Sequence, residues 1–245
     1  MVIDIGNTLT KVAFFDNDNL LFTNHFNLID DTLIDKLLTK YDVDSAIISS
    51  VKKDKEEWQR ALGQKIKLTH FNAAMATGIH NHYLSPGTLG LDRLAAVIGA
   101  HKLFAGDDNL VIDGGTCITY DHIDREGNYF GGSISPGLSM RYNALNYFTA
   151  ALPLVNTAEG FNKPNGVDTV TSIQSGVQNG IKYELTGFIE SYVKKGRQLN
   201  VILTGGDCYF FDTVLKNSIF APYIKIEPYL VLKGLNAAIQ QQHND

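Results

Sequence analysis

The chain has 245 residues, of which 44% are apolar and 19% are charged, a composition that indicates a globular protein and excludes an intrinsically disordered one. Its 21 basic and 26 acidic side chains give a net charge of −5 without a basic run, so we expect no nucleic-acid partner, because phosphate neutralisation needs clustered Lys and Arg. No apolar run reaches about 18 residues and the two cysteines make no disulfide framework, so the sequence predicts a cytoplasmic protein without a membrane span.

The first half of the chain is predicted to alternate strands and helices after an opening hairpin. An Asp-Asn-Asp-Asn turn at 16–19 joins the second and third strands, and Asp30 or Asp31 is the expected N-cap of the first helix. The segment 76–90 is rich in Gly, Pro, His and Asn, which predicts a loop. The expected strands are 2–5, 10–15, 20–26, 45–51 and 66–71, and the expected helices are 31–40, 54–63 and 92–104.

The second half repeats this opening. The first strand and the turn after it, VIDIGNTLT at 2–10, return as VIDGGTCIT at 111–119. Two halves that each begin with a strand meander and continue with β–α units indicate an α/β fold built by internal duplication, with domains 1–108 and 109–245 around a ligand cleft. The further expected strands are 110–113, 117–123, 129–135 and 200–204, and the further helices are 137–149, 169–194 and 230–242.

Each copy carries an Asp, a Gly and a Thr in the turn between two strands. Gly lets backbone N–H groups approach an anion closely, Thr adds a hydroxyl donor, and Asp can hold the cation that accompanies a phosphate. Lys11 follows the first turn and can neutralise a β- or γ-phosphate. One such turn alone is most often a simple hairpin turn. Its repetition, together with the bare Gly-Gly surface of VILTGGD at 201–207, predicts a nucleotide whose phosphates lie between two turns.

These motifs resemble those of the actin-like and sugar-kinase superfamily of ATP-binding proteins, which implies a duplicated, ribonuclease H-like ATPase fold. Within it the chain is similar to the type III pantothenate kinases over residues 2–206. The departure from the family pattern is Cys117, where the family has Ala; both residues are small, so we expect little effect. The matching motifs are DIGNTLTK at 4–11, GLDR at 90–93, DGGTCIT at 113–119, GGSISPG at 131–137 and LTGG at 203–206.

The resemblance implies ATP-dependent phosphorylation of the primary hydroxyl of pantothenate, the first step of coenzyme A biosynthesis. It assigns Asp92 as the proton acceptor, for which the alternative is a helix N-cap. Gly90, Leu91 and Arg93 of the same motif are expected to bind pantothenate, whose carboxylate suits the fork of an arginine. Tyr83 is assigned to the same substrate, against the alternative of an ordinary loop aromatic.

Cofactors and partners are implied in the same way. Asp4 is expected to orient hydrated Mg²⁺, and Asp113 to bind a monovalent cation, K⁺ or NH₄⁺. The motif at 131–137 implies a homodimer in which Thr169 reaches pantothenate across the interface, unless Asp168 or Thr169 serves as a helix N-cap. The expected ATP-binding residues are Asp4, Ile5, Gly6, Asn7, Thr8, Leu9, Thr10, Lys11, Thr116, Gly205 and Gly206.

Two other functions are compatible with the same fold. One is a kinase for another small hydroxylated metabolite, against which Tyr83 and the GLDR motif count through resemblance alone. The other is a catalytically inactive, nucleotide-binding regulatory relative, which should have lost Asp92 or Lys11; both are present. A purine held by backbone alone further predicts weak discrimination among nucleotides.

Overall fold

The computed structural model describes residues 1–6, 9–50, 57–75, 77–194 and 197–244. Contacts between its residues divide the chain into two compact units. Within the described residues, no helix is both long and apolar enough to cross a membrane. Unit 1 consists of Met1–Ala105, Glu126–Phe130 and Tyr229–Asp245, and unit 2 consists of Gly106–Arg125 and Gly131–Pro228.

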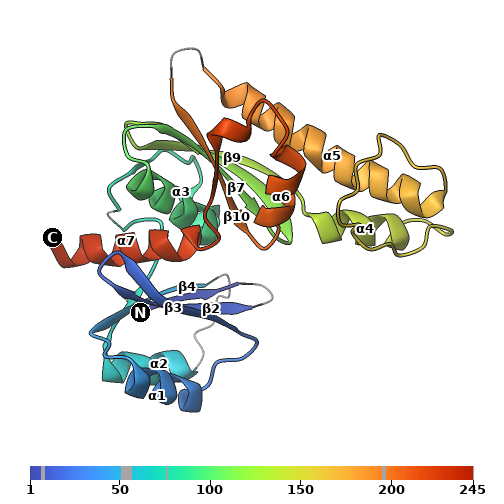
Figure 1. Ribbon diagram of the computed structural model, residues 1–245. Coiled ribbons are helices and arrows are strands. Elements are labelled where there is room, and N and C mark those ends of the chain that lie inside the picture. Colours follow the sequence, from blue (N-terminus) through green and yellow to red (C-terminus); the bar gives the residue numbers. More distant parts are fainter. Residues whose placement is uncertain (7–8, 51–56, 76, 195–196, 245) are drawn as a thin grey trace. The chain divides into compact units, whose positions relative to one another are not determined.

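Unit 1 is built on a mixed sheet with the strand order β3-β2-β1-β4-β5 (Figure 1). Its strands are β1 Val2–Ile5, β2 Thr10–Asp16, β3 Asn19–Phe26, β4 Ser45–Ser50 and β5 Lys67–His70. Strand β1 is antiparallel to β2 and parallel to β4. Helices α1 (Asp31–Lys40) and α2 (Glu57–Lys65) cover one face, where Ile34 and Leu62 pack against Ile3 and Val12. The N-cap of α1 is Asp30, whose carboxylate accepts the Leu33 N–H at 2.8 Å.

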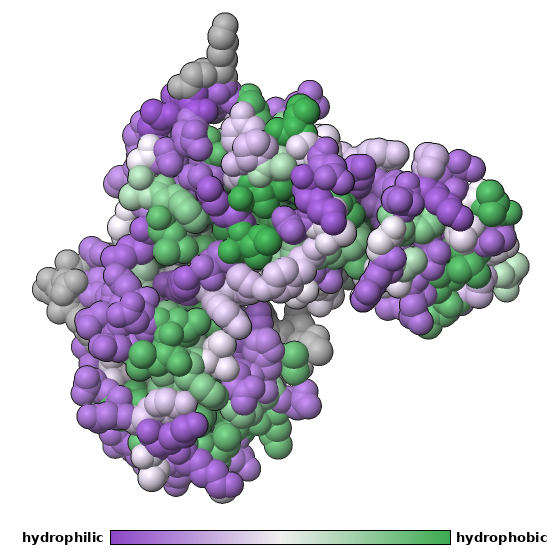
Figure 2. All heavy atoms as spheres, viewed as in Figure 1, coloured by the Kyte–Doolittle hydropathy of each residue, from purple (hydrophilic) through white to green (hydrophobic). Residues whose placement is uncertain are grey.

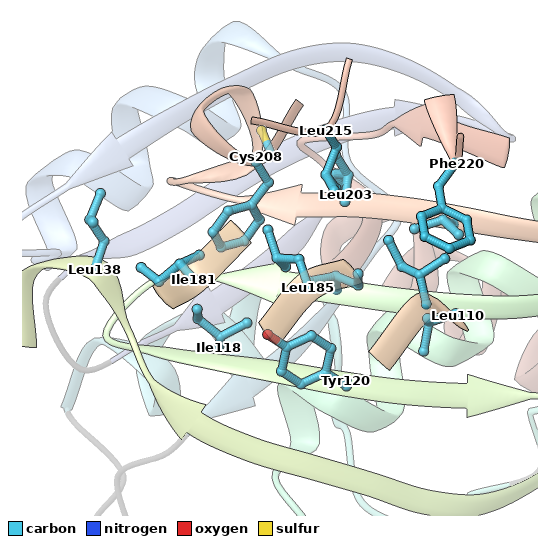
Figure 3. Close-up of a cluster of buried hydrophobic side chains, with 14 of the residues drawn as sticks. Leu110, Ile118, Tyr120, Leu138, Ile181, Leu185, Leu203, Cys208, Leu215 and Phe220 are labelled. Atoms are coloured by element: carbon cyan, nitrogen blue, oxygen red, sulfur yellow. The ribbon is translucent and has the colours of Figure 1, made fainter. Parts of the chain in front are cut away.

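The sheet of unit 2 has the strand order β11-β10-β7-β8-β9-β6, in which β6 (His80–Asn81) and the first residues of β9 belong to unit 1. Strand β7 is antiparallel to β8 and parallel to β10, because the apolar run of β7 is buried on both faces and admits a parallel neighbour. Its core is shown in Figure 3, where side chains of the sheet such as Leu110 and Tyr120 pack against Leu185 and Leu215 of the covering helices. The elements are β7 Asp108–Gly114, β8 Cys117–Ile123, β9 Asn128–Pro136, β10 Leu199–Gly205, β11 Ile224–Ile226, α4 Leu138–Tyr147, α5 Thr169–Tyr192 and α6 Cys208–Leu215.

The two sheets share one topology. In each, two further strands follow an opening meander: the first pairs in parallel with the first strand of the meander, and the second pairs in parallel with that added strand. This confirms the predicted duplicated α/β fold. The expected elements are found with ends shifted by a few residues, while Val51 and positions 54–56 of the expected second helix lie outside the described residues.

The sequence patterns missed five short elements: two strands, one α-helix and two 3₁₀ turns. Strands β6 (His80–Asn81) and β11 contain too few residues to show a period, and β6 owes its existence to parallel pairing with the first residues of β9. Helix α6 is a short apolar segment after a Gly-Gly turn, where helix and buried strand cannot be told apart by periodicity. The 3₁₀ turns at Pro86–Thr88 and Ala221–Tyr223 complete the set.

The C-terminal helix α7 (Leu230–Asn244) belongs to unit 1, where it packs along α3 (Leu91–Leu103) and against β1 and β4. The two helices approach so closely that a Cβ added at Gly234 would lie 1.7 Å from the Ala95 carbonyl oxygen. The contact-based units therefore differ from the expected domains 1–108 and 109–245, since residues 229–245 return to the N-terminal unit. Chain order alone does not show this return, because it rests on a glycine contact between distant helices.

We expect Gly234→Ala to lower the free energy of unfolding by about 1–3 kcal/mol, because the added methyl group would clash with the backbone of α3. Urea denaturation measures this difference. The matched control is Gly187→Ala in α5, whose added Cβ meets no atom within 4 Å. This control should be neutral or stabilising by up to about 1 kcal/mol, since alanine favours a helix over glycine. Equal effects of the two substitutions would contradict the close packing of α3 and α7.

Candidate active site

Asp4 lies at the end of β1 in the sheet of unit 1, and its neighbours are set by strand pairing. It is paired with Lys11 across the antiparallel contact and with Ser49 across the parallel one. Burial raises the pKa of Asp4 to about 6; Lys11 opposes the rise, the Asp92 carboxylate adds to it, and a hydrogen bond from Ser49 lowers it. The site thus brings two carboxylates, one ammonium group and a buried serine hydroxyl into electrostatic contact.

The raised pKa of Asp4 predicts a pH dependence of stability in the ligand-free protein. The pKa of Asp4 in the folded protein exceeds its ordinary value of about 3.9, so the folded state binds this proton more tightly than the unfolded state does. The protonated carboxyl group therefore stabilises the fold below about pH 4, and this stabilisation is lost as the pH rises through about 6. Asp4→Asn should therefore raise the free energy of unfolding at pH 7 by up to about 3 kcal/mol. Urea denaturation from pH 4 to pH 8 measures it, with the exposed Asp42→Asn as control. Curves that stay parallel to the wild type would contradict the burial of this charge.

Asp92 lies in the first turn of α3, and the N-cap of that helix is Gly90, which makes no side-chain cap hydrogen bond. The alternative that Asp92 is the N-cap is therefore wrong. The Asp92 carboxylate accepts the N–H of Arg93 at 2.8 Å and folds back over Gly90, where an added Cβ would lie 2.6 Å from Asp92 Oδ1. A glycine at position 90 thus leaves the space that the carboxylate needs. Leu91, between them, is half-buried as the first residue of α3.

Arg93 is 6% exposed, and its guanidinium carbon lies 5.8 Å from the ring centroid of Tyr83. The Tyr83 ring stacks in turn on the buried Tyr129 at 6.5 Å, and the Tyr83 N–H donates to Asn81 Oδ1. The loop residue Tyr83 therefore contacts Arg93, the neighbour of Asp92 in the GLDR motif, within unit 1. The structure adds Tyr129 and Ser49, which the sequence reasoning missed. Ser49 had a recognisable signal, a hydroxyl at the carboxyl end of a buried strand.

The second turn that the sequence predicts to bind phosphate lies in unit 2, where β7 and β10 end side by side. Thr204 is paired with Asp113 and Gly205 with Gly114. Gly205 has a φ of 80° and leaves no space for a side chain, since an added Cβ would lie 2.2 Å from Asp113 Oδ1. Gly206 follows as an exposed residue with no atom within 4 Å of an added Cβ. The expected cation residue Asp113 and the expected adenosine residues are therefore neighbours.

The turn itself leaves Gly115 and Thr116 exposed. It is closed by a hydrogen bond from the Gly115 N–H to the Cys117 carbonyl at 2.9 Å, while the Thr116 carbonyl accepts the N–H of Gly137 at 3.1 Å. The outward edge of the turn therefore consists of accessible backbone and one threonine side chain, the composition expected of a phosphate-binding turn.

The other residues predicted to bind ATP lie in and around the first turn of unit 1. Asn7 and Thr8 lie outside the described residues. Ile5 is 2% exposed and packs in the core of unit 1, so only its backbone is available to a ligand. Gly6 donates its N–H to the Leu9 carbonyl and closes the first turn, and Thr10 opens β2.

Thr169 is the exposed first residue of α5, and the cap of that helix is Asp168, which forms a capping box with Thr171. The cap alternative thus holds for Asp168 and leaves the side chain of Thr169 uncommitted to capping. Among the residues that the structure describes, no group of three or more His, Cys, Asp or Glu could hold a metal ion.

The shared topology of the two sheets and the turn at the end of the first strand of each define an actin-like, sugar-kinase-like ATPase fold. Solved structures support this class at the level of fold. A Baf-family chain from Campylobacter jejuni matches with a TM-score of 0.63 at 20% identity, covering 100% of this chain and 99% of that one. The activator of 2-hydroxyisocaproyl-CoA dehydratase from Clostridium difficile, solved with bound ADPNP, matches with a TM-score of 0.58 at 10% identity, covering 99% and 96%.

Sequence comparisons narrow the class. The family model described as type III pantothenate kinase matches residues 1–195. A type III pantothenate kinase of Bacteroides fragilis is 45% identical over 96% of this chain and 95% of its own length. The type III pantothenate kinase of Phocaeicola vulgatus is 42% identical over 100% of this chain and 98% of its own length. The chain belongs to the type III pantothenate kinase family.

Proposed function

We propose that this chain transfers the γ-phosphoryl group of ATP to the primary hydroxyl of pantothenate, with Asp92 accepting the hydroxyl proton. The observation that carries the proposal is the placement of Asp92, which lies within electrostatic reach of Asp4 and directly precedes the buried Arg93. The names of the relatives supply the acceptor, and the fold of the ADPNP-bound neighbour supports the nucleotide.

The reaction needs positioning and charge neutralisation more than covalent chemistry. The hydroxyl oxygen attacks the γ-phosphorus, the bond to the bridging oxygen breaks, and ADP leaves with the electron pair. The hydroxyl proton passes to the Asp92 carboxylate as that bond forms. Arg93 binds the pantothenate carboxylate, and the stacked Tyr83 and Tyr129 rings hold the guanidinium in place.

The residues at the two proposed cation sites have the chemistry that these cations need. Mg²⁺ is commonly held by one or two carboxylates together with substrate phosphates and several waters, and Asp4 supplies one half-buried carboxylate for such a hydrated ion. When bound, the ion neutralises charge on the transferring phosphoryl group. Asp113 is the proposed residue for K⁺ or NH₄⁺, beside the exposed turn that presents Thr116 to phosphate. Lys11 serves the β- or γ-phosphate.

The nucleoside half of ATP is assigned to unit 2, next to Gly205 and Gly206. A cavity of about 930 Å³ lies between α5, α6 and the loop 157–162 of this unit, and α6 begins two residues after Gly206. Tyr209 and Phe210 of α6 and Lys182 of α5 line it. Gly205 and Gly206 are not among its lining residues, so the glycine pair at the end of β10 remains the proposed contact for adenosine.

A homodimer completes the proposal. In unit 2, β9, α4 and the segment after α4 expose several large apolar side chains, among them Ile134 at 63%, Tyr147 at 82% and Phe148 at 80%. Apolar (green) residues are visible on this end of unit 2 in Figure 2. Exposed apolar patches of this kind mark association surfaces. Light scattering coupled to size exclusion tests the dimer, and Tyr147→Glu with Phe148→Glu should yield a monomer.

The assignment is tested by ADP release and by NMR detection of 4′-phosphopantothenate, with Mg²⁺ and with K⁺, NH₄⁺ or Na⁺ as the monovalent salt. We expect turnover that requires pantothenate and that K⁺ or NH₄⁺ supports better than Na⁺. Hydrolysis of ATP that is indifferent to pantothenate would remove the acceptor and favour another hydroxylated substrate. Nucleotide binding without any turnover would favour the regulatory alternative.

A further inference from the structure

The second phosphate turn of unit 2 is supported by the junction between β9 and α4. The Gly137 N–H donates to the Thr116 carbonyl at 3.1 Å. The contact is so close that a Cβ added at Gly137 would lie 2.2 Å from the Gly115 carbonyl oxygen and 2.5 Å from that of Thr116. Any displacement of Gly137 toward the turn would therefore push against its backbone, and any displacement away would break the hydrogen bond.

The junction is held in place by Arg141, four residues further on in α4. Its Nε donates to the Pro136 carbonyl at 2.8 Å, and its Nη2 donates to Ser135 Oγ at 2.8 Å. Its backbone N–H donates to the Gly137 carbonyl at 3.0 Å. One side chain thus binds the two residues that immediately precede Gly137. A lysine side chain has a single nitrogen and cannot form the two side-chain hydrogen bonds in the geometry that the planar guanidinium gives them.

Arg141 is oriented from the other side by Glu184 of α5. Nη2 lies 2.5 Å from Glu184 Oε2, and Glu184 Oε1 accepts the hydroxyl of the buried Tyr120 at 2.8 Å. The Tyr120 ring stacks on Phe188 of α5 at 3.9 Å. Burial tends to raise the pKa of Glu184, but hydrogen bonds from Arg141, Ser135 and Tyr120 lower it, so the carboxylate is charged when it binds the guanidinium. The side chains of Arg141 and Glu184 are 19% and 22% exposed, so the pair is withdrawn from most of the solvent.

We propose that Arg141 is a positioning residue for the second phosphate turn, acting through Pro136 and Gly137, and that Glu184 fixes its orientation. Arg141 contacts the backbone that supports the turn and is assigned no contact with substrate. The inference rests on the proposed use of this turn to bind the phosphates of ATP. An ion pair that merely joins α4 to α5 would stabilise the fold without selective influence on the nucleotide.

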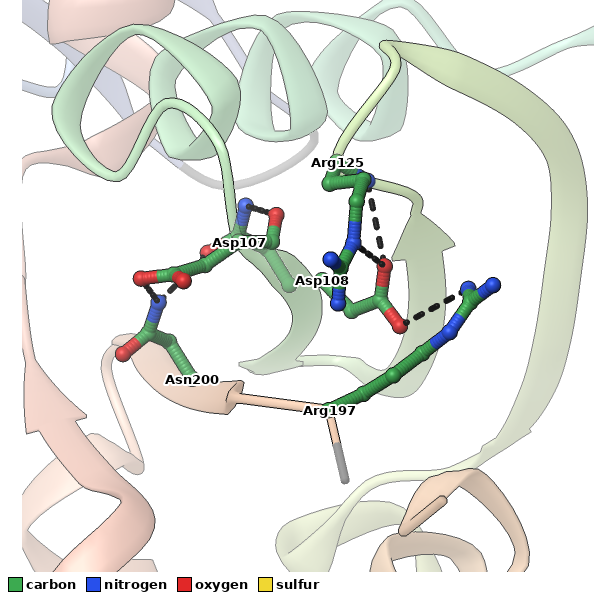
Figure 4. Close-up of polar contacts among 6 residues, drawn as sticks. Asp107, Asp108, Arg125, Arg197 and Asn200 are labelled. Carbon is green, nitrogen blue, oxygen red and sulfur yellow. Dashed lines mark hydrogen bonds and ion pairs between the residues drawn. The ribbon is translucent and has the colours of Figure 1, made fainter. Parts of the chain in front are cut away.

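The test compares Arg141→Lys with an ion-pair control in the same unit. Arg197 lies 3.5 Å from the buried Asp108, with Arg125 on the other carboxylate oxygen (Figure 4). Asp108 is the first residue of β7, whereas the phosphate turn follows the last, so Arg197→Lys weakens a longer and more exposed ion pair at the opposite end of the strand. Calorimetric titration with Mg-ADP and steady-state kinetics are measured for the wild type and both variants.

We expect Arg141→Lys to weaken Mg-ADP binding and raise the KM for ATP by about tenfold, which corresponds to about 1.4 kcal/mol, with the KM for pantothenate within twofold of wild type. Arg197→Lys should leave both constants unchanged. Ser135→Ala, which removes one Arg141 partner, should shift Mg-ADP affinity in the same direction by a smaller factor and serves if Arg141→Lys does not fold.

Two results would overturn the role. One is Mg-ADP affinity within twofold of wild type in both Arg141→Lys and Ser135→Ala. The other is an equal rise in the KM for ATP and for pantothenate. Because Mg-ADP binding is measured without an acceptor, failure of pantothenate as substrate would leave this test intact and would be recognised separately.

Discussion

Asp92→Asn is expected to lower kcat for pantothenate phosphorylation by about 10²- to 10⁴-fold, the range for losing a positioned proton acceptor. The amide keeps the size of the carboxylate and an oxygen that can accept the Arg93 N–H, so α3 should fold normally. It cannot take the proton of the substrate hydroxyl. Rates of ADP release at saturating ATP and pantothenate, with circular dichroism to confirm folding, measure the effect.

The matched control for this variant is Asp31→Asn, which alters an exposed acid in the first turn of α1. It changes the same functional group at a similar position in a helix and should leave kcat within about twofold of wild type, as surface substitutions usually do. If Asp92→Asn also retains kcat within about threefold, Asp92 is not the proton acceptor and P–O bond formation proceeds without general-base assistance from this residue.

Arg93→Met is expected to raise the KM for pantothenate by roughly 10- to 150-fold, because a charge-assisted hydrogen bond contributes about 1.5–3 kcal/mol. The KM for ATP should stay within about threefold, because Arg93 is assigned to the acceptor rather than to the phosphates. Initial rates over a matrix of ATP and pantothenate concentrations separate the two constants. Lys102→Met, near the other end of α3, removes an exposed cation and provides the control.

A second substrate sharpens this prediction. In a pantothenate analogue whose carboxylate is replaced by an alcohol, the proposed partner of Arg93 is missing. The wild type should therefore have a lower KM for pantothenate than for the analogue, by a factor similar to the KM increase that Arg93→Met causes with pantothenate. The Arg93→Met variant should have almost the same KM for both substrates. A preference that survives unchanged in the variant would assign carboxylate recognition to another residue.

Local sequence patterns were sufficient for most of the secondary structure and for the duplication. The strands at 2–5 and 117–123 and the helix at 31–40 follow from apolar periodicity and turn chemistry, which act over a few neighbouring residues. The repeated Asp-Gly turn predicted two related sheets, and five strands of each sheet follow the same order. The GLDR motif placed Asp92 and Arg93 at a helix start, where the structure has them.

The surroundings of those residues depend on tertiary structure. Ser49 meets Asp4 only because β4 pairs in parallel with β1, and the pKa of Asp4 rises only because the folded sheet buries it. Tyr129 reaches Tyr83 through the pairing of β6 with β9. Such contacts join residues that are far apart in the chain, so no local periodicity of the sequence predicts them.

By itself the sequence determined that this is a duplicated α/β protein with two phosphate-type turns and a catalytic candidate at Asp92. Only the tertiary structure decided that α7 returns to pack on α3, that Gly90 makes room for the Asp92 carboxylate, and that Arg141 and Glu184 support the second turn. The reason is physical: helix and strand preferences are local, whereas burial, close backbone approach and ion pairing arise only when distant segments are brought together.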